Sequence, residues 1–302
     1  MDFQQLRLVF RVGKIFAITP PSLEIKNQTT NQKYYSCFMI VFYTVGVLVS
    51  SYCRKSYYLQ HIHIKFAIQI ILDSSLYVFN ICTVLIALNK RSQWFILIKN
   101  FKIMQEGSEK VNNKSHLLKF AISNFFFWGI VLHITYTFTS LMGVDFFKMF
   151  TIQYVQIYAQ FLHNFLIYTV LNMLRVRYRA VTLALSKEVC LVTKLERRSV
   201  ASFLNKIKYD VCILKESVDI FNNIFGWPNL LIILSASLQI LLSFDYIFQE
   251  SLIGDFERIV ENIVIIFLFC VSGVILFYIF LIIILVRCNF QHSVGRFDSA
   301  RS

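Results

Sequence analysis

The chain has 302 residues, of which 57% are hydrophobic and only 16% are charged, and its formal net charge is +13. Soluble domains carry about 25% charged residues, so this composition excludes an ordinary soluble protein and indicates a helical membrane protein. The positive charge does not indicate nucleic-acid binding, because the basic residues lie between the apolar stretches, where the positive-inside rule accounts for them.

Residues 1–33 form a predicted cytosolic segment that opens with a short amphipathic helix. Basic and apolar side chains fall on different faces of this helix, which fits a position on anionic lipid. A solvated helical arm fits the same pattern, and Pro20 and Pro21 are expected to end the helix in either case.

Six apolar stretches follow, and each is long enough for the roughly 20-residue helix that crosses about 30 Å of hydrocarbon. Most of the 30 Lys and Arg residues lie on one side of these stretches, which predicts that this side is cytoplasmic. The fold class is therefore an all-α polytopic bundle in a single receptor domain, residues 1–302, with both termini, including the tail 287–302, in the cytoplasm. The predicted transmembrane helices are residues 35–52, 66–88, 120–142, 150–174, 227–247 and 263–286.

The region between the fourth and fifth spans, residues 175–223, is charged and is expected to form long cytosolic helical extensions. Apolar residues recur there at alternating spacings of three and four, which is typical of one packed helix face. We interpret this face as packing against a neighbouring cytosolic helix. The residues of this stripe are Leu204, Ile207, Val211, Leu214, Val218 and Phe221.

Polar side chains inside the spans are costly, so their positions are the best indication of function. Because consecutive spans run in opposite directions, nine of these side chains fall in the outer half of the bilayer, where they would form a cavity for a small ligand. The alternative is that they only hydrogen-bond between helices and stabilise the bundle. The candidate ligand-binding residues are Gln69, Asp73, His133, Tyr136, Gln153, Gln156, Gln160, Gln239 and Tyr246.

Asp73 indicates function most strongly, because a charge in the middle of a span costs about 2.5–3.5 kcal/mol on insertion scales. The sequence contains no zinc-binding His-Glu-x-x-His motif and no phosphate-binding glycine-rich loop, and its cysteines have no metal-ligand spacing. We therefore expect no enzymatic activity, no cofactor and no metal. Inverted repeats, which would favour a transporter, are not apparent.

The stretch from Tyr209 to Gly226 resembles the insect gustatory receptors, a family within a larger chemoreceptor superfamily. In that family a charged helix passes through an Asn-x-x-Phe-Gly segment into the fifth span, and Asn222, Phe225 and Gly226 follow this pattern. The inward N-terminus, the basic loop between spans four and five and the short outer loop between spans three and four extend the resemblance over essentially the whole chain.

The resemblance implies a subunit of a ligand-gated cation channel that binds a small-molecule tastant from outside. It implies a homo- or hetero-tetramer with related receptor subunits, surrounded by membrane lipid in the plasma membrane of a sensory neuron. It also implies that the charged cytosolic region, with the apolar stripe from Leu204 to Phe221, is where the subunits meet. An odorant receptor of the same superfamily and a small-molecule membrane transporter stay open as alternatives. A G-protein-coupled receptor is disfavoured by the inward N-terminus.

The resembled family also has a seventh helix, which lines the pore and carries a Thr-Tyr signature followed by Gln-Phe. No such signature occurs in this sequence, so we expect either a truncated or alternatively spliced form or a chain without its own pore helix. In both cases the expectation is that the chain does not conduct ions alone.

Overall fold

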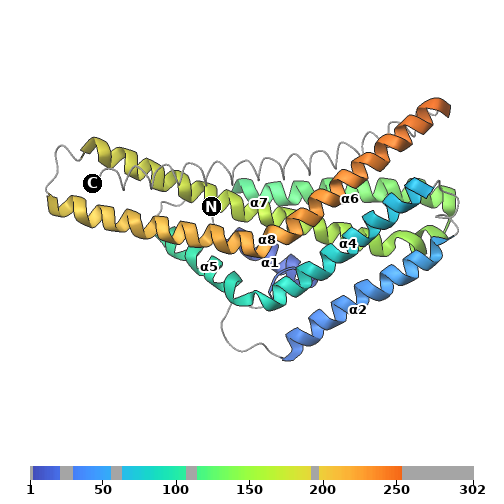
Figure 1. Ribbon diagram of the computed structural model, residues 1–302, viewed down its shortest axis with the longest axis horizontal. Coiled ribbons are helices and arrows are strands. Elements are labelled where there is room, and N and C mark those ends of the chain that lie inside the picture. Colours follow the sequence, from blue (N-terminus) through green and yellow to red (C-terminus); the bar gives the residue numbers. More distant parts are fainter. Residues whose placement is uncertain (1–2, 21–29, 56–62, 107–113, 192–196, 254–302) are drawn as a thin grey trace. The chain divides into compact units, whose positions relative to one another are not determined.

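The computed structural model describes residues 3–20, 30–55, 63–106, 114–191 and 197–253, and every regular element in these ranges is an α-helix (Figure 1). The chain divides into two compact units, Met1–Ile232 and Ile233–Ser302, and the contacts described below lie within the first. The all-α fold class is confirmed for the described residues. The helices are α1 (Phe3–Ile15), α2 (Thr30–Cys53), α4 (His63–Asn89), α5 (Arg91–Glu106), α6 (Lys114–Met142), α7 (Asp145–Leu191) and α8 (Arg197–Ile253).

Four segments of these helices are long and apolar enough to cross a membrane: Lys33–Cys53, Phe66–Asn89, Phe120–Ser140 and Asn205–Leu242. They correspond to the first, second, third and fifth predicted spans. The predicted fourth span lies inside α7, where a ladder of Gln, His and Asn side chains lowers the hydropathy. The predicted sixth span, residues 263–286, lies outside the described residues, so the count of six spans stays a prediction.

The helices α7 and α8 are much longer than a membrane span. α7 has 47 residues and α8 has 57. At 1.5 Å per residue they are about 70 Å and about 85 Å long, whereas the hydrocarbon layer is about 30 Å thick. Each helix is therefore much longer than one membrane crossing requires. Residues 175–191 and 197–223 of the region between predicted spans four and five are helical, and their cytosolic location stays a prediction.

Two tight connections link consecutive helices. Gly143 takes a φ of +66° between α6 and α7, and its N–H donates to the Thr139 carbonyl at 2.9 Å. A positive φ there costs a glycine little, so the chain turns back within two residues. At the other connection, Lys90 joins α4 to α5 through helical hydrogen bonds from Lys90 N to Ile86 O and from Trp94 N to Lys90 O. Helix α5 was not predicted from the sequence, because its polar and apolar residues are mixed.

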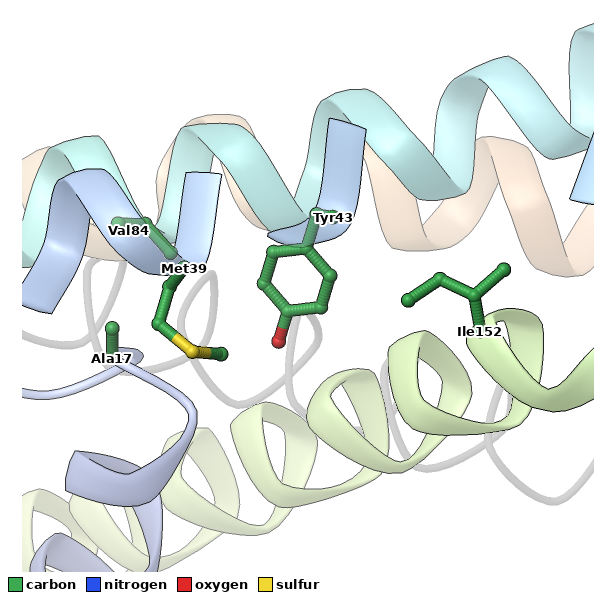
Figure 2. Close-up of a cluster of buried hydrophobic side chains, with 5 residues drawn as sticks. All are labelled: Ala17, Met39, Tyr43, Val84 and Ile152. Atoms are coloured by element: carbon green, nitrogen blue, oxygen red, sulfur yellow. The ribbon is translucent and has the colours of Figure 1, made fainter. Parts of the chain in front are cut away.

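The centre of the first unit lies where α2, α4 and α7 pack together, with α1 against α7. Figure 2 shows the buried cluster at this place. The ring of Tyr43 on α2 lies between Met39, on the same helix, and Ile152 of α7. Val84 of α4 and Ala17 of the N-terminal segment complete the cluster. α7 therefore packs against α1, α2 and α4 and is central to the first unit.

The N-terminal segment is part of this core, which differs from both arrangements that the sequence suggests for it. Val9 and Phe10 are buried, and Ile18 packs with Ala159 and Leu162 in the middle of α7. The hydroxyl of Thr19 donates to the Phe10 carbonyl at 2.9 Å. The apolar face of α1 is thus covered by α7 rather than by lipid, because a matching apolar face on α7 is available.

Candidate functional site

A buried ion pair joins the C-terminal end of α2 to α4. The guanidinium Nη1 of Arg54 lies 3.0 Å from Oδ2 of Asp73, and the two side chains are only 4% and 14% exposed. Arg54 follows the last residue of α2 directly, and its N–H donates to the Ser50 carbonyl, so the helical path of α2 positions it. A pair this buried keeps its charges only if further polar contacts compensate for the lost water.

Two glutamines supply those contacts. Nε2 of Gln69, one turn before Asp73 on α4, donates to Oδ1 of Asp73 at 3.2 Å. Nε2 of Gln153 on α7 donates to the same oxygen at 3.5 Å, and Oε1 of Gln153 accepts from Arg54 Nη1 at 3.5 Å. Arg54, Asp73, Gln69 and Gln153 form what we call the outer polar network, and it connects α2, α4 and α7.

The first turns of α7 hold the arginine end of the outer polar network in place. The guanidinium carbon of Arg54 lies 5.4 Å from the ring centroid of Phe150, which is a cation–π distance. The hydroxyl of Ser50 donates to the carbonyl of Met149. The end of α2 is therefore fastened to α7 through a ring face and a main-chain oxygen, which orients Arg54 toward Asp73.

Sequence reasoning predicts three members of the outer polar network, Gln69, Asp73 and Gln153, and the structure brings them together. It does not predict Arg54, which lies two residues beyond the predicted first span. The available signal is Asp73 itself, since a carboxylate within a span requires a partner, and Arg54 is one of the few basic residues on the predicted outer side.

The other predicted ligand-binding residues lie apart from this network. Gln156 is buried on α7, and its Nε2 makes no hydrogen bond within the described part of the chain. Gln160 is half-buried one turn further along α7. His133 and Tyr136 are exposed on α6, Tyr136 with 78% of its surface accessible.

The remaining two predicted residues belong to the second unit. Gln239 is half-buried on α8, and the side chain of Tyr246 lies outside the described residues. The structure therefore brings three of the nine predicted residues into the outer polar network, all on α4 and α7.

The apolar stripe of α8 is largely enclosed within the chain. Ile207, Leu214 and Phe221 are buried, Val211 and Val218 are half-buried, and the side chain of Leu204 lies outside the described part. The neighbouring helices are α5 and α7, as several side-chain contacts show. Phe225, which continues the stripe, contacts Trp94 of α5 at 5.2 Å and His163 of α7 at 5.4 Å between ring centroids.

The N-terminal half of α8 also lies near α7, as an electrostatic effect between the two helices indicates. Burial lowers the pKa of Arg177 on α7, and the carboxylate of Asp210 on α8 opposes this shift. An arginine keeps its charge in proteins, so Asp210 is a favourable neighbour for the half-buried Arg177.

A cavity of about 360 Å³ lies elsewhere, on α8, and is lined by Cys212, Lys215, Glu216, Asp219, Ile220 and Asn223. These residues lie along one face of a single helix, and all except Ile220 are exposed. An open hollow of this kind encloses no ligand, whereas the outer polar network is buried and has convergent polar groups. We therefore regard the network as the candidate site.

The profile of the 7tm chemosensory receptors matches residues 6–296, which is nearly the whole chain, and the chain therefore belongs to this family. No curated protein matches the chain. Membership makes the protein a chemoreceptor, and it agrees with the apolar helices that are long enough to cross a membrane.

Proposed function

We propose that the protein is a gustatory-type chemoreceptor subunit that binds small polar molecules from outside the cell at the outer polar network. The buried pair of Arg54 and Asp73 carries this proposal, because it is a pair of charges enclosed between helices, and Asp73 lies in a segment apolar enough to cross a membrane. Ionisable groups at such positions mark binding sites and ion pathways more often than they mark plain packing.

The chemistry of the network favours a ligand with several hydrogen-bonding groups. Asp73 accepts hydrogen bonds from two glutamine amides, and one turn further along α7 the buried Nε2 of Gln156 lacks a partner in the described residues. A sugar-like or amine-bearing molecule can replace such bonds, whereas an apolar volatile molecule leaves them unmade at a cost of about 1–3 kcal/mol each. This difference supports a gustatory rather than an odorant receptor.

The proposal includes six transmembrane helices, cytoplasmic termini and a location in the plasma membrane of a sensory neuron. It also includes gating of a cation channel when the chain is assembled with related subunits. The length of α7 and α8 supports a large cytosolic helical region in which subunits meet. The apolar stripe of α8 faces α5 and α7 and is not free to contact another subunit. Its role in assembly is therefore indirect, because it fixes the rotation of α8 and so determines which charged face of that helix a neighbouring subunit meets.

The test compares two carboxylates, one buried and one exposed. Cells express the full chain, alone and with a related receptor subunit, and voltage clamp records currents evoked by sugars, amino acids, bitter compounds and volatile odorants. Asp73→Asn is expected to raise the half-maximal concentration at least tenfold or to abolish the response at equal surface expression. Asp145→Asn is the matched control, because Asp145 is exposed and pairs with Lys148 within one turn.

A response confined to odorants would support the odorant receptor instead. Uptake of a labelled ligand without any current would support a transporter. Equal responses of the two carboxylate variants would contradict a ligand site at Asp73. Ligand binding is measured independently as a rise in the unfolding temperature of the purified full chain, since a ligand stabilises the state that binds it.

A further inference from the structure

Lys90 is the single residue between helices α4 and α5, and α5 continues directly from α4. α4 ends at Asn89 and α5 begins at Arg91. The main chain of Lys90 is hydrogen-bonded on both sides of the junction, because its N–H donates to the Ile86 carbonyl and its carbonyl accepts from the Trp94 N–H. A movement of α4 is therefore transmitted to the first turn of α5 without a flexible loop. α4 is also the helix that carries Asp73 of the outer polar network.

At this junction the chain contacts α8 through two strong hydrogen bonds. Nζ of Lys90 donates to the main-chain carbonyl of Asn223 at 2.5 Å and to Oδ1 of its side chain at 2.7 Å. Nδ2 of Asn223 in turn donates to Oε1 of Gln93 at 3.0 Å. Hydrogen bonds from a charged donor are about twice as strong as neutral ones, so Lys90 binds this turn of α8 firmly.

Buried aromatic rings reinforce the same contact. Trp94, one turn after Lys90, and Phe225 of α8 are both buried, with ring centroids 5.2 Å apart in an edge-to-face arrangement. Further along the two helices, Asn100 donates to Glu216 Oε2 at 3.0 Å and to Ser217 Oγ at 3.3 Å. The residue pairs run in opposite order, so α5 and α8 are antiparallel along what we call the α5–α8 seam, from Lys90 and Asn223 to Asn100 and Ser217.

The turn of α8 that Lys90 binds is intrinsically weak. Pro228 lies inside α8 and lacks an N–H, so the carbonyl of Ile224 loses its usual helical partner. Asn223 lies one residue before that carbonyl and Phe225 one residue after it. Lys90 and Trp94 therefore hold α8 on both sides of the position where its own hydrogen bonding is interrupted.

We propose that Lys90 is a positioning residue that couples the ligand site to α8. A ligand that shifts α4 at Asp73 displaces Lys90 at the other end of the same helix, and Lys90 carries the shift to the weak turn of α8. This inference rests on the proposed function, because it assigns a route between the ligand site and the channel. It predicts that Lys90 affects the response without affecting the binding of the ligand.

The test uses the full chain with Lys90→Met, which keeps the length of the side chain and removes its charge. Lys102→Met is the matched control, because Lys102 is exposed on the same helix α5. Hydrogen exchange of the amides of residues 221–230 is measured first, without ligand. Lys90→Met is expected to speed exchange there at least fivefold, and Lys102→Met is expected to leave it unchanged.

The second measurement compares binding with response. For Lys90→Met we expect a ligand dissociation constant within twofold of the original chain and a maximal current reduced at least fivefold at equal surface expression. Asn223→Ala is expected to give a smaller loss, because the main-chain carbonyl remains, and the double variant is expected to resemble Lys90→Met alone. If Lys90→Met does not reach the surface, Lys90→Gln, which keeps a donor, is measured in the same way.

Two results would overturn the inference. One is unchanged hydrogen exchange in Lys90→Met, and the other is a parallel loss of ligand binding and current, which indicates a purely structural residue. A failure of the proposed function has a different signature. In that case the original chain shows no ligand-evoked current, while the hydrogen-exchange difference at the α5–α8 seam is still present.

Discussion

Asp73 holds a carboxylate within a helix that is apolar enough to cross a membrane, and Arg54, Gln69 and Gln153 stabilise it there. The contribution of such a pair is asymmetric. Desolvation offsets much of the attraction between the two charges, whereas removing one partner leaves the other charge buried and uncompensated. Comparing the stability of variants that lack one member of the pair with that of a variant that lacks both therefore tests whether Arg54 and Asp73 are buried in the membrane-inserted protein.

We predict that Arg54→Met lowers stability strongly, by about 3–5 kcal/mol, because Asp73 then remains as a buried charge without its cation. The double variant Arg54→Met with Asp73→Leu is expected to recover most of the loss, since it leaves no buried charge. The thermal unfolding midpoint and the surface expression of the full chain measure both effects.

The control for this prediction is Lys148→Met. Lys148 pairs with Asp145 at 2.8 Å, but both side chains are well exposed, at 63% and 66%. The hydrogen bond to Asp145 raises the pKa of Lys148, which therefore stays charged at neutral pH. Exposed pairs contribute little, so an unchanged midpoint is expected for this variant. Equal losses in Lys148→Met and Arg54→Met would contradict the burial of the Arg54–Asp73 pair.

At the scale of elements, α2 and α7 approach each other closely beside the outer polar network. A Cβ atom at Gly46 of α2 would lie 2.6 Å from Cδ1 and Cγ1 and 3.2 Å from Cβ of Ile152 on α7. The last contact involves the atom nearest the backbone, so a rotamer change of Ile152 does not relieve the clash fully. Small residues at helix contacts in membranes permit this kind of approach.

We predict that Gly46→Ala separates α2 from α7 and destabilises the full chain by about 1–3 kcal/mol, the usual cost of overpacking. Gly129→Ala on α6 is the matched control, because no neighbouring atom in the described part of the chain lies within 4 Å of the added Cβ. Both glycines lie inside apolar helices, so the gain in helix propensity is the same. A higher unfolding temperature for Gly46→Ala than for Gly129→Ala would exclude the observed contact of α2 with α7.

At the scale of the whole molecule, the distribution of charge predicts the orientation in the membrane. Most basic residues lie on the side of the chain that includes both termini, and the positive-inside rule places this side in the cytoplasm. The structure adds that α7 and α8 are too long to end at the membrane surface. With the predicted fourth and fifth spans, the remainder of α7 and α8 is expected to project from one side of the membrane, and the charge pattern predicts that this is the cytoplasmic side.

We predict that epitope tags at Met1 and Ser302 are stained only after the cells are permeabilised. Asn113, which lies in an Asn-x-Ser sequence on the predicted cytoplasmic side, is expected to carry no glycan. Gel mobility before and after glycosidase treatment measures the latter. Staining of either tag on intact cells would reverse the predicted orientation and would place the outer polar network on the opposite side.

The sequence by itself determined the helical class, the approximate position of the four segments that are long and apolar enough to cross a membrane, and the meeting of Gln69, Asp73 and Gln153. These features depend on local patterns, because the hydropathy of each segment and the spacing of its polar residues decide whether it is a helix and which face is buried. The alternating direction of the spans then brings their outer ends together.

Only the tertiary structure decided which groups are partners. Arg54 pairs with Asp73 because the end of α2 packs on α7, and no local pattern encodes that contact. The N-terminal segment is enclosed in the bundle, and α5 covers the apolar stripe of α8, because complementary surfaces from distant parts of the chain are available there. An amphipathic sequence predicts that one face of a helix is buried. Which element packs on that face depends on the tertiary structure.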